Sequence, residues 1–187
     1  MTQGTTIDDE ADLVRRLAAY DADAWQTVFR LYHRPLFRLA YVRTFQQTLA
    51  EDIAAEVLSE AARGIGRYTY RGVPFRAWLF RIANNLIADH LKAQLRRPQV
   101  YLEEVEEVIG LAVSGSFEAV EANEDFFHAL EGLTQEQKTA LTLRFVNDLN
   151  LEETAASMGK SVGAIKQLQH RALGALREKL PREEERT

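Results

Sequence analysis

The sequence predicts an all-α protein of two small helical domains, which an acidic, flexible linker joins. Apolar residues recur at spacings of three and four along most of the chain, the period of a helix with one buried face. Glycine and proline stand mainly between these stretches, and no stretch alternates apolar and polar residues as a half-buried strand does. We expect a flexible N-terminal segment at 1–19, domains at 20–97 and 124–181, the linker at 98–123 and a tail at 182–187.

The composition of the 187-residue chain excludes several classes of site. It has no cysteine, which rules out disulfides, thiolate metal sites and cysteine nucleophiles. The four histidines, at positions 33, 90, 128 and 170, are not spaced as metal ligands, so we expect neither a metal nor another cofactor. No apolar run approaches the roughly 18 residues of a membrane helix, and the acidic, polar start predicts no signal peptide.

Charge is unevenly distributed along the chain, although the net charge is only −5. Residues 63–97 hold eight Lys or Arg and one Asp, and residues 160–179 hold five basic residues and one acid. Between them, residues 98–127 hold eight acids and no base. Basic blocks on predicted helices are typical of contact with a polyanion, whereas a chance cluster on a solvated face is the alternative for either block.

Two helices are expected before the first basic block. Residues 23–41 carry apolar side chains at helical spacing, and Pro35 inside this pattern predicts a kink or a break near His33. Residues 50–63, AEDIAAEVLSEAAR, form a second, acidic helix.

Residues 75–98, FRAWLFRIANNLIADHLKAQLRRP, predict an unusual helix. On a helical wheel its apolar residues take one arc, and a cationic stripe with Trp78 and Arg96 at its edge takes another. The stripe consists of Arg81, Asn85, Ala88 and Lys92, with Asn84 nearby. Unpaired bases need aromatic faces for stacking, amides for base edges and cations for phosphates. The alternative is that Trp78 is a core residue and that the arginines are only solvated.

The segment before this helix favours the nucleic-acid interpretation. Residues 63–75, RGIGRYTYRGVPF, carry Tyr68, Tyr70 and three arginines in a loop that Gly72 and Pro74 shape. A basic, aromatic loop that leads into a basic, aromatic helix is typical of a surface that binds single-stranded nucleic acid.

A helix-turn-helix is predicted at 149–180. Asn150 and Glu153 have the spacing of a capping box, Gly159 stands where a turn needs a positive φ, and Ser161 can cap a second helix. The predicted outer face of that second helix carries Lys166, Gln167, His170 and Arg171. Such side chains suit base edges and phosphates in a major groove, whereas a plain helical hairpin with a solvated face is the alternative.

Together these stretches resemble an extracytoplasmic-function (ECF, group IV) sigma factor, a two-domain promoter-specificity subunit of bacterial RNA polymerase. The resemblance covers most of residues 20–180, and its most specific element is W-L-x-R-I-A-x-N, at 78–85, followed by the helix-turn-helix. By this resemblance, 20–97 corresponds to sigma region 2 and 124–181 to sigma region 4.

The resemblance implies a role for each domain. Region 2 would bind the β′ clamp helices of core polymerase through Asp52, Glu56 and Leu58, and would melt the −10 element by capturing its non-template strand. The residues implied in −10 binding are Tyr68, Tyr70, Arg71, Phe75, Arg76, Trp78, Arg81, Asn84, Asn85, Lys92, Arg96 and Arg97. Region 4 would dock on the β flap and read the −35 duplex. The residues implied in −35 binding are Ser161, Lys166, Gln167, His170 and Arg171.

The resemblance further implies a non-catalytic, cytoplasmic protein that is monomeric when free. A cognate anti-sigma factor would cover its basic faces and could hold it at the membrane. Two positions depart from the family pattern: Leu168 stands where many relatives have arginine, and Ala88 stands where the family is often basic. We therefore expect region 4 to lack a phosphate contact at Leu168, so that the family pattern does not give its −35 sequence, and we expect Ala88 to leave the −10 stripe less basic.

A stand-alone helix-turn-helix regulator is the main alternative function, but it leaves residues 75–98 unexplained. An enzyme is a second alternative. The sequence offers it no carboxylate pair, nucleophile elbow or phosphate-binding glycine loop. A helical adaptor protein is the third, and it would lose nothing if Arg81, Lys92 or Arg171 were neutralised.

Overall fold

The computed structural model describes residues 7–70, 72–96, 130 and 132–179, and no strand occurs among them. The predicted all-α class is confirmed. The first domain consists of α1 (Ile7–Ala18), α2 (Ala22–Thr44), α3 (Gln47–Gly64), the short 3₁₀ helix η1 (Ile65–Arg67) and α4 (Phe75–Arg96). The second consists of α7 (Gln135–Leu141), the π-helical turn η2 (Thr142–Val146), α8 (Leu151–Met158) and α9 (Val162–Lys179). The predicted linker and tail lie outside the described residues.

Helix α1 corrects the expectation of a flexible segment at 1–19. Residues 7–18 are helical, and Leu17 is fully buried in the core of the first domain. The indole Nε1 of Trp25 on α2 donates to the carbonyl oxygen of Leu17 at 3.1 Å. Leu13, Val14 and Leu17 stand at helical spacing and all pack on the core, so a local signal for this helix was present and was overlooked because the segment is short and begins with polar, acidic residues.

Helix α2 begins at a side-chain cap. Asp21 accepts hydrogen bonds from the backbone N–H groups of Asp23 and Ala24, at 2.9 and 3.1 Å. The Arg16 guanidinium donates to the same carboxylate at 2.8 Å. The bond from Arg16, reinforced by the cap N–H groups, lowers the pKa of Asp21 to about 2.

Helix α2 continues through Pro35, so a break near His33 does not occur. A proline inside a helix lacks the N–H that would bond to the carbonyl four residues earlier, here that of Leu31. The residue that carries this carbonyl, Leu31, is 56% exposed. Helix α2 packs against both α3 and α4.

The core of the first domain lies between α2, α3 and α4. Its large side chains are at most 2% exposed and include Leu36, Leu39, Ile53, Phe75, Phe80 and Ile87. Burial of these apolar surfaces is the main source of the domain's stability.

No helix in the described part of the chain has the length and apolarity needed to cross a bilayer.

The second domain confirms the predicted helix-turn-helix. Asn150 starts α8 in a capping box with Glu153, and Gly159 ends it with a φ of 64°. Ser161 then caps α9, because its Oγ accepts from the backbone N–H of Ala164 at 3.2 Å. The sequence predicted each of these local features.

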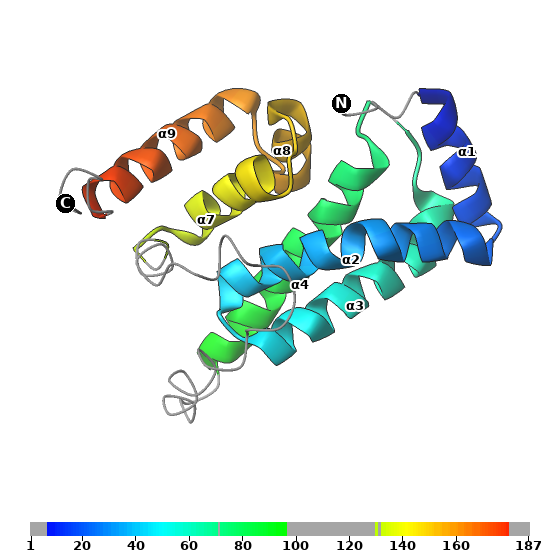
Figure 1. Ribbon diagram of the computed structural model, residues 1–187, viewed down its shortest axis with the longest axis horizontal. Coiled ribbons are helices and arrows are strands. Elements are labelled where there is room, and N and C mark those ends of the chain that lie inside the picture. Colours follow the sequence, from blue (N-terminus) through cyan, green and yellow to red (C-terminus); the bar gives the residue numbers. More distant parts are fainter. Residues whose placement is uncertain (1–6, 71, 97–129, 131, 180–187) are drawn as a thin grey trace, which may run out of the picture.

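The two domains pack against each other in what we call the closed arrangement (Figure 1). Helix α8 contacts α4, and Leu143 and Leu149 of the second domain belong to the core of the first. At the end of α2, Arg43 is only 9% exposed and donates to Gln135 Oε1 at 2.8 Å and to Thr139 Oγ1 at 3.1 Å. Burial lowers the pKa of Arg43 to about 10.

Candidate nucleic-acid interface

A surface pocket of about 320 Å³ opens between α3, η1 and α4. Its volume is at the lower end of the range of small-molecule sites, about 300–1,000 Å³. The residues that line it are Glu60, Gly64, Arg67, Tyr68, Trp78, Ile82, Asn85 and Leu86. The pocket thus combines aromatic rings, an amide and both signs of charge at one place on the surface. We call it the α4 pocket.

An aromatic cluster forms one wall of the α4 pocket. The ring centroid of Trp78 lies 5.1 Å from that of Tyr68 and 5.6 Å from that of Phe75. Trp78 and Tyr68 are half-buried, so each ring keeps part of its surface accessible. Phe75 is only 2% exposed, which corrects its prediction as a −10 contact: its ring is packed into the core and supports the other two.

The Tyr68 hydroxyl is held by the protein itself. It lies 2.8 Å from the carbonyl oxygen of Val73 and 3.1 Å from the carboxylate of Glu10 on α1. Burial, with the nearby Glu10 carboxylate, raises the pKa of Tyr68, so the phenol stays protonated. These bonds fix the ring at the mouth of the loop that leads into α4.

The polar stripe of α4 is partly open. Arg81, Asn85 and Lys92 are exposed, and Lys92 lies 3.8 Å from Asp89 in a surface ion pair. Tyr70 in the preceding loop is 48% exposed. The predicted contacts Arg71 and Arg97 lie outside the described residues, and so does the side chain of Arg96.

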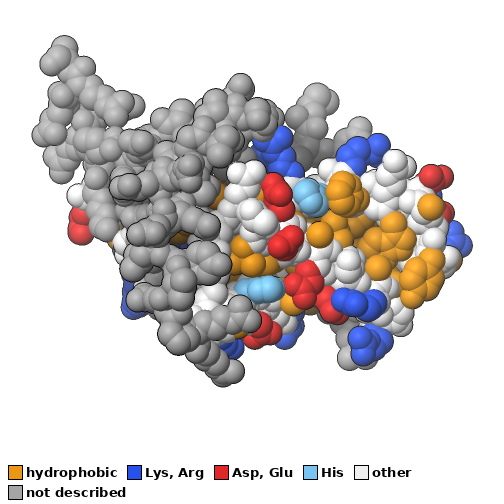
Figure 2. Space-filling view, turned by 90° about the horizontal axis from the view of Figure 1, so that it is seen from below, with side chains coloured by type: hydrophobic (Ala, Val, Ile, Leu, Met, Phe, Trp, Pro, Cys, Tyr) orange, Lys and Arg blue, Asp and Glu red, His pale blue; other side chains and the backbone are white. Residues whose placement is uncertain are grey.

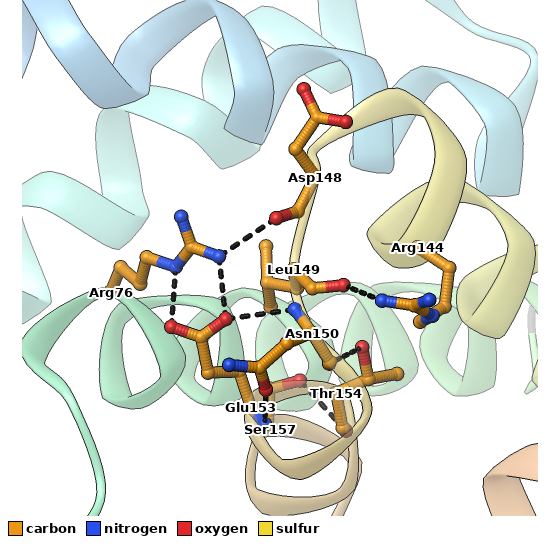
Figure 3. Close-up of polar contacts among 8 residues, drawn as sticks. All are labelled: Arg76, Arg144, Asp148, Leu149, Asn150, Glu153, Thr154 and Ser157. Atoms are coloured by element: carbon orange, nitrogen blue, oxygen red, sulfur yellow. Dashed lines mark hydrogen bonds and ion pairs between the residues drawn. The ribbon is translucent and has the colours of Figure 1, made fainter. Parts of the chain in front are cut away.

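In the closed arrangement the second domain occupies two predicted −10 residues: Arg76, whose contacts Figure 3 shows, and Asn84. Arg76 donates from Nε to Glu153 Oε1 at 2.7 Å, makes a second bond to the other carboxylate oxygen, and donates to the carbonyl oxygen of Asp148 at 2.8 Å. Asn84 donates from Nδ2 to the carbonyl oxygen of Ser157 at 3.3 Å. The stripe therefore has an open part around Asn85 and a part covered by α8.

The predicted −35 residues lie together on α9. Lys166, Gln167, His170 and Arg171 are exposed, while Ile165 on the opposite side is fully buried. Ser161 caps the helix and stands at its start, where backbone N–H groups favour a phosphate. The outward residues thus share one face of the second helix of the helix-turn-helix.

The predicted polymerase-binding residues lie on α3. Asp52 is exposed, Leu58 is half-buried against the core, and the Glu56 carboxylate lies 3.1 Å from His90 Nε2 on α4. Figure 2 views the molecule from the side on which α3 lies in Figure 1, and acidic side chains form a band across the middle of that face.

Three charged residues at or near the α4 pocket were missing from the predicted site residues: Glu10, Glu60 and Arg67. Arg67 could have been found, because it stands in the basic, aromatic loop that the sequence singled out. Glu60 lines the pocket through the packing of α3, and Glu10 contacts the pocket residue Tyr68 through the packing of α1, so no local pattern marks either of them. Among the described residues, no three His, Asp or Glu side chains gather as a metal site would require.

Two family models match the chain. The model of Sigma-70 region 2 matches residues 28–97, and that of Sigma-70 region 4 matches residues 129–178. The first therefore covers α3, α4 and the α4 pocket, and the second covers the helix-turn-helix.

Curated relatives and solved structures agree with this match. The ECF RNA polymerase sigma factor ShbA of Streptomyces griseus is 32% identical over 91% of this chain and 96% of its own length. The ECF RNA polymerase sigma factor BldN of Streptomyces coelicolor is 38% identical over 91% of this chain, which spans 65% of that relative. The sigma factor RpoE from Bartonella quintana, solved in complex with the anti-sigma factor NepR, superposes with a TM-score of 0.64 at 25% identity, over 83% of this chain and 95% of its own.

Proposed function

The chain belongs to the family of ECF RNA polymerase sigma factors, and from this premise we propose that it directs promoter-specific initiation as a non-catalytic subunit of bacterial RNA polymerase. It binds the core enzyme, reads the −35 duplex with α9, and melts the −10 element by capturing the non-template strand on α4. The proposal places the chain in the bacterial cytoplasm, where core polymerase and the chromosome are found.

The observation that carries the proposal is the α4 pocket. Trp78 and Tyr68 offer ring faces for stacking, and exposed Asn85 offers an amide for a base edge. Stacking contributes about 1–3 kcal/mol per base, and taking a base out of the duplex costs a few kcal/mol. Stacking together with base-edge and phosphate contacts can therefore offset the cost of extruding a base, so that melting proceeds by binding and without ATP.

Duplex recognition is assigned to the second domain. Gln167 and Lys166 stand where side chains of a recognition helix reach base edges and phosphates in a major groove, with Arg171 and His170 one turn further on. Leu168, half-buried on α9, is not available as the phosphate contact that an arginine would provide there.

The proposed protein partners follow from family membership. Core polymerase would engage the acidic face of α3, with Asp52, Glu56 and Leu58, at its β′ clamp helices and the second domain at its β flap. A cognate anti-sigma factor is proposed because RpoE from Bartonella quintana was solved with NepR. We propose that the chain is monomeric when neither partner is bound.

Run-off transcription with core polymerase from Streptomyces on a promoter library tests the proposal. The chain should direct initiation at a subset of promoters that share a −35 and a −10 sequence. A stand-alone helix-turn-helix regulator would instead shift duplex DNA without polymerase and would give no chain-dependent transcripts. That second result would overturn the proposal.

A further inference from the structure

The second domain covers part of the surface that the proposed function assigns to the −10 strand. Arg76 and Asn84 lie on α4, and their partners Glu153 and Ser157 lie one turn apart on α8. The side chain of Arg76 is 34% exposed and that of Glu153 only 10%, so the ion pair is partly shielded from water, on the Glu153 side above all.

The contacts on α8 resemble those of a nucleic-acid strand in their chemistry. The Glu153 carboxylate takes two parallel bonds from the Arg76 fork, the geometry in which arginine also binds phosphate. The Ser157 carbonyl accepts from the Asn84 amide, as an acceptor on a base edge would. A strand and α8 therefore cannot occupy these two side chains together.

We propose that α8 is an autoinhibitory element: the Arg76–Glu153 ion pair holds the helix-turn-helix against α4 and keeps the −10 surface closed until the domains separate. The inhibitory role rests on the proposed function, because it requires that α4 binds the −10 strand. The contact between α8 and α4 does not depend on that function and can be measured in the free chain. Separation frees Arg76 and Asn84 at the same time as it frees α9 to reach a distant duplex.

The interface between the two domains contains buried polar groups that destabilise it and so favour its opening. Three polar atoms buried near it have no hydrogen-bond partner among the described residues: Asn84 Oδ1, Arg144 Nε and Asn147 Oδ1. Buried polar atoms without partners are destabilising, and opening restores their contact with water. The hydrogen bonds of buried Arg43 go to the neutral oxygens of Gln135 and Thr139 rather than to a carboxylate, which adds a desolvation cost to the closed arrangement.

Glu153 can be changed without losing the start of α8. Its Oε2 also accepts from the backbone N–H of Asn150 at 2.8 Å, as the reciprocal half of a capping box. Glutamine serves the same role at the start of α7, where Gln137 Oε1 accepts from the Thr134 N–H at 2.8 Å. Glu153→Gln therefore keeps the cap and removes the charge that grips Arg76.

The matched control is Glu152→Gln, since Glu152 is exposed in the same first turn. The chain has no cysteine, so a donor and an acceptor dye can be placed at Ala55→Cys on α3 and Gly174→Cys on α9, both exposed positions. Energy transfer in the full chain reports domain separation without DNA. Anisotropy of a fluorescein-labelled, random-sequence single-stranded 12-mer pool reports strand binding.

Glu153→Gln should lower energy transfer and tighten binding of the 12-mer pool by about tenfold or more, with Glu152→Gln unchanged in both. Lower transfer without tighter binding would support closure by Glu153 and contradict the proposed −10 function. Unchanged transfer in Glu153→Gln, or an equal loss in Glu152→Gln, would overturn the inference whatever the DNA result.

Discussion

The carboxylate of Glu10 lies 3.1 Å from the hydroxyl of Tyr68 and also accepts a hydrogen bond from the backbone N–H of Phe75. One side chain of α1 therefore joins both the loop and the first residue of α4. Helix α1 precedes the residues matched by the region 2 model, which begin at 28, yet it supports a wall of the α4 pocket.

Glu10→Ala tests this support. The change removes an acceptor from the half-buried Tyr68 hydroxyl and a carboxylate from the N-terminus of α4, so the free energy of unfolding should fall by about 1 kcal/mol. Denaturant titration measures it. Asp12→Ala on the same helix is the control, because its pair with Arg15 is exposed and should contribute less than about 1 kcal/mol. Equal effects would contradict a specific role for Glu10.

Asn85→Ala should weaken capture of the −10 strand. Removal of one base-edge contact costs about 1–3 kcal/mol of binding, and the fold should be unchanged because Asn85 is exposed. Open-complex formation with core polymerase is the measurement. Gln94→Ala, an exposed amide further along α4, should have no such effect. If the Asn85→Ala variant formed open complexes normally, Asn85 would not be a contact of the −10 strand.

Arg171→Ala should weaken binding to the −35 duplex and reduce the slope of log affinity against log salt concentration by about 1, because one phosphate contact is lost. The slope is measured for the polymerase holoenzyme between low and moderate salt. Arg177→Ala, an exposed arginine two turns further along α9, serves as the control. An unchanged slope for Arg171→Ala would show that Arg171 makes no phosphate contact in the complex.

Two glycine substitutions should move stability in opposite directions. Gly159 has a φ of 64°, and an added Cβ meets no atom within 4 Å, so Gly159→Ala should cost about 1 kcal/mol through backbone strain alone. Gly174 is exposed inside α9 with the same free space, and Gly174→Ala should stabilise by about 0.5–1 kcal/mol. Thermal melting of the two variants compares them. If Gly159→Ala stabilised the protein as Gly174→Ala should, the requirement for a positive φ at Gly159 would be refuted.

The helix-turn-helix could be predicted in detail because its signals are local. Asn150, Gly159 and Ser161 act on neighbours within a few residues, and the structure confirms each role. The inward arc of α4 was also predictable, since helical spacing alone brings Phe80 and Ile87 to one side.

The remaining features depend on residues far apart in the chain. Glu10 meets Tyr68 across 58 positions, and Arg76 meets Glu153 across 77. No periodicity encodes such pairings, so the closed arrangement and the contact of α1 with the α4 pocket were not foreseen. Phe75 illustrates a further limit: the wheel placed it inward, and the family pattern suggested a DNA contact, but its burial follows from packing against Tyr68 and Trp78.

Glu153 serves two hydrogen-bonding systems, and this has a consequence for how such a protein can evolve. Its bond to Asn150 belongs to the helix-turn-helix alone, whereas its bonds to Arg76 exist only while the domains touch. On the two proposals made above, a substitution at Arg76 would weaken both the closed arrangement and the capture of the −10 strand, but it would leave the cap of α8 and the outward face of α9 intact. Selection among variants at Arg76 would therefore act on closure and −10 binding together, while −35 choice would evolve through residues of α9.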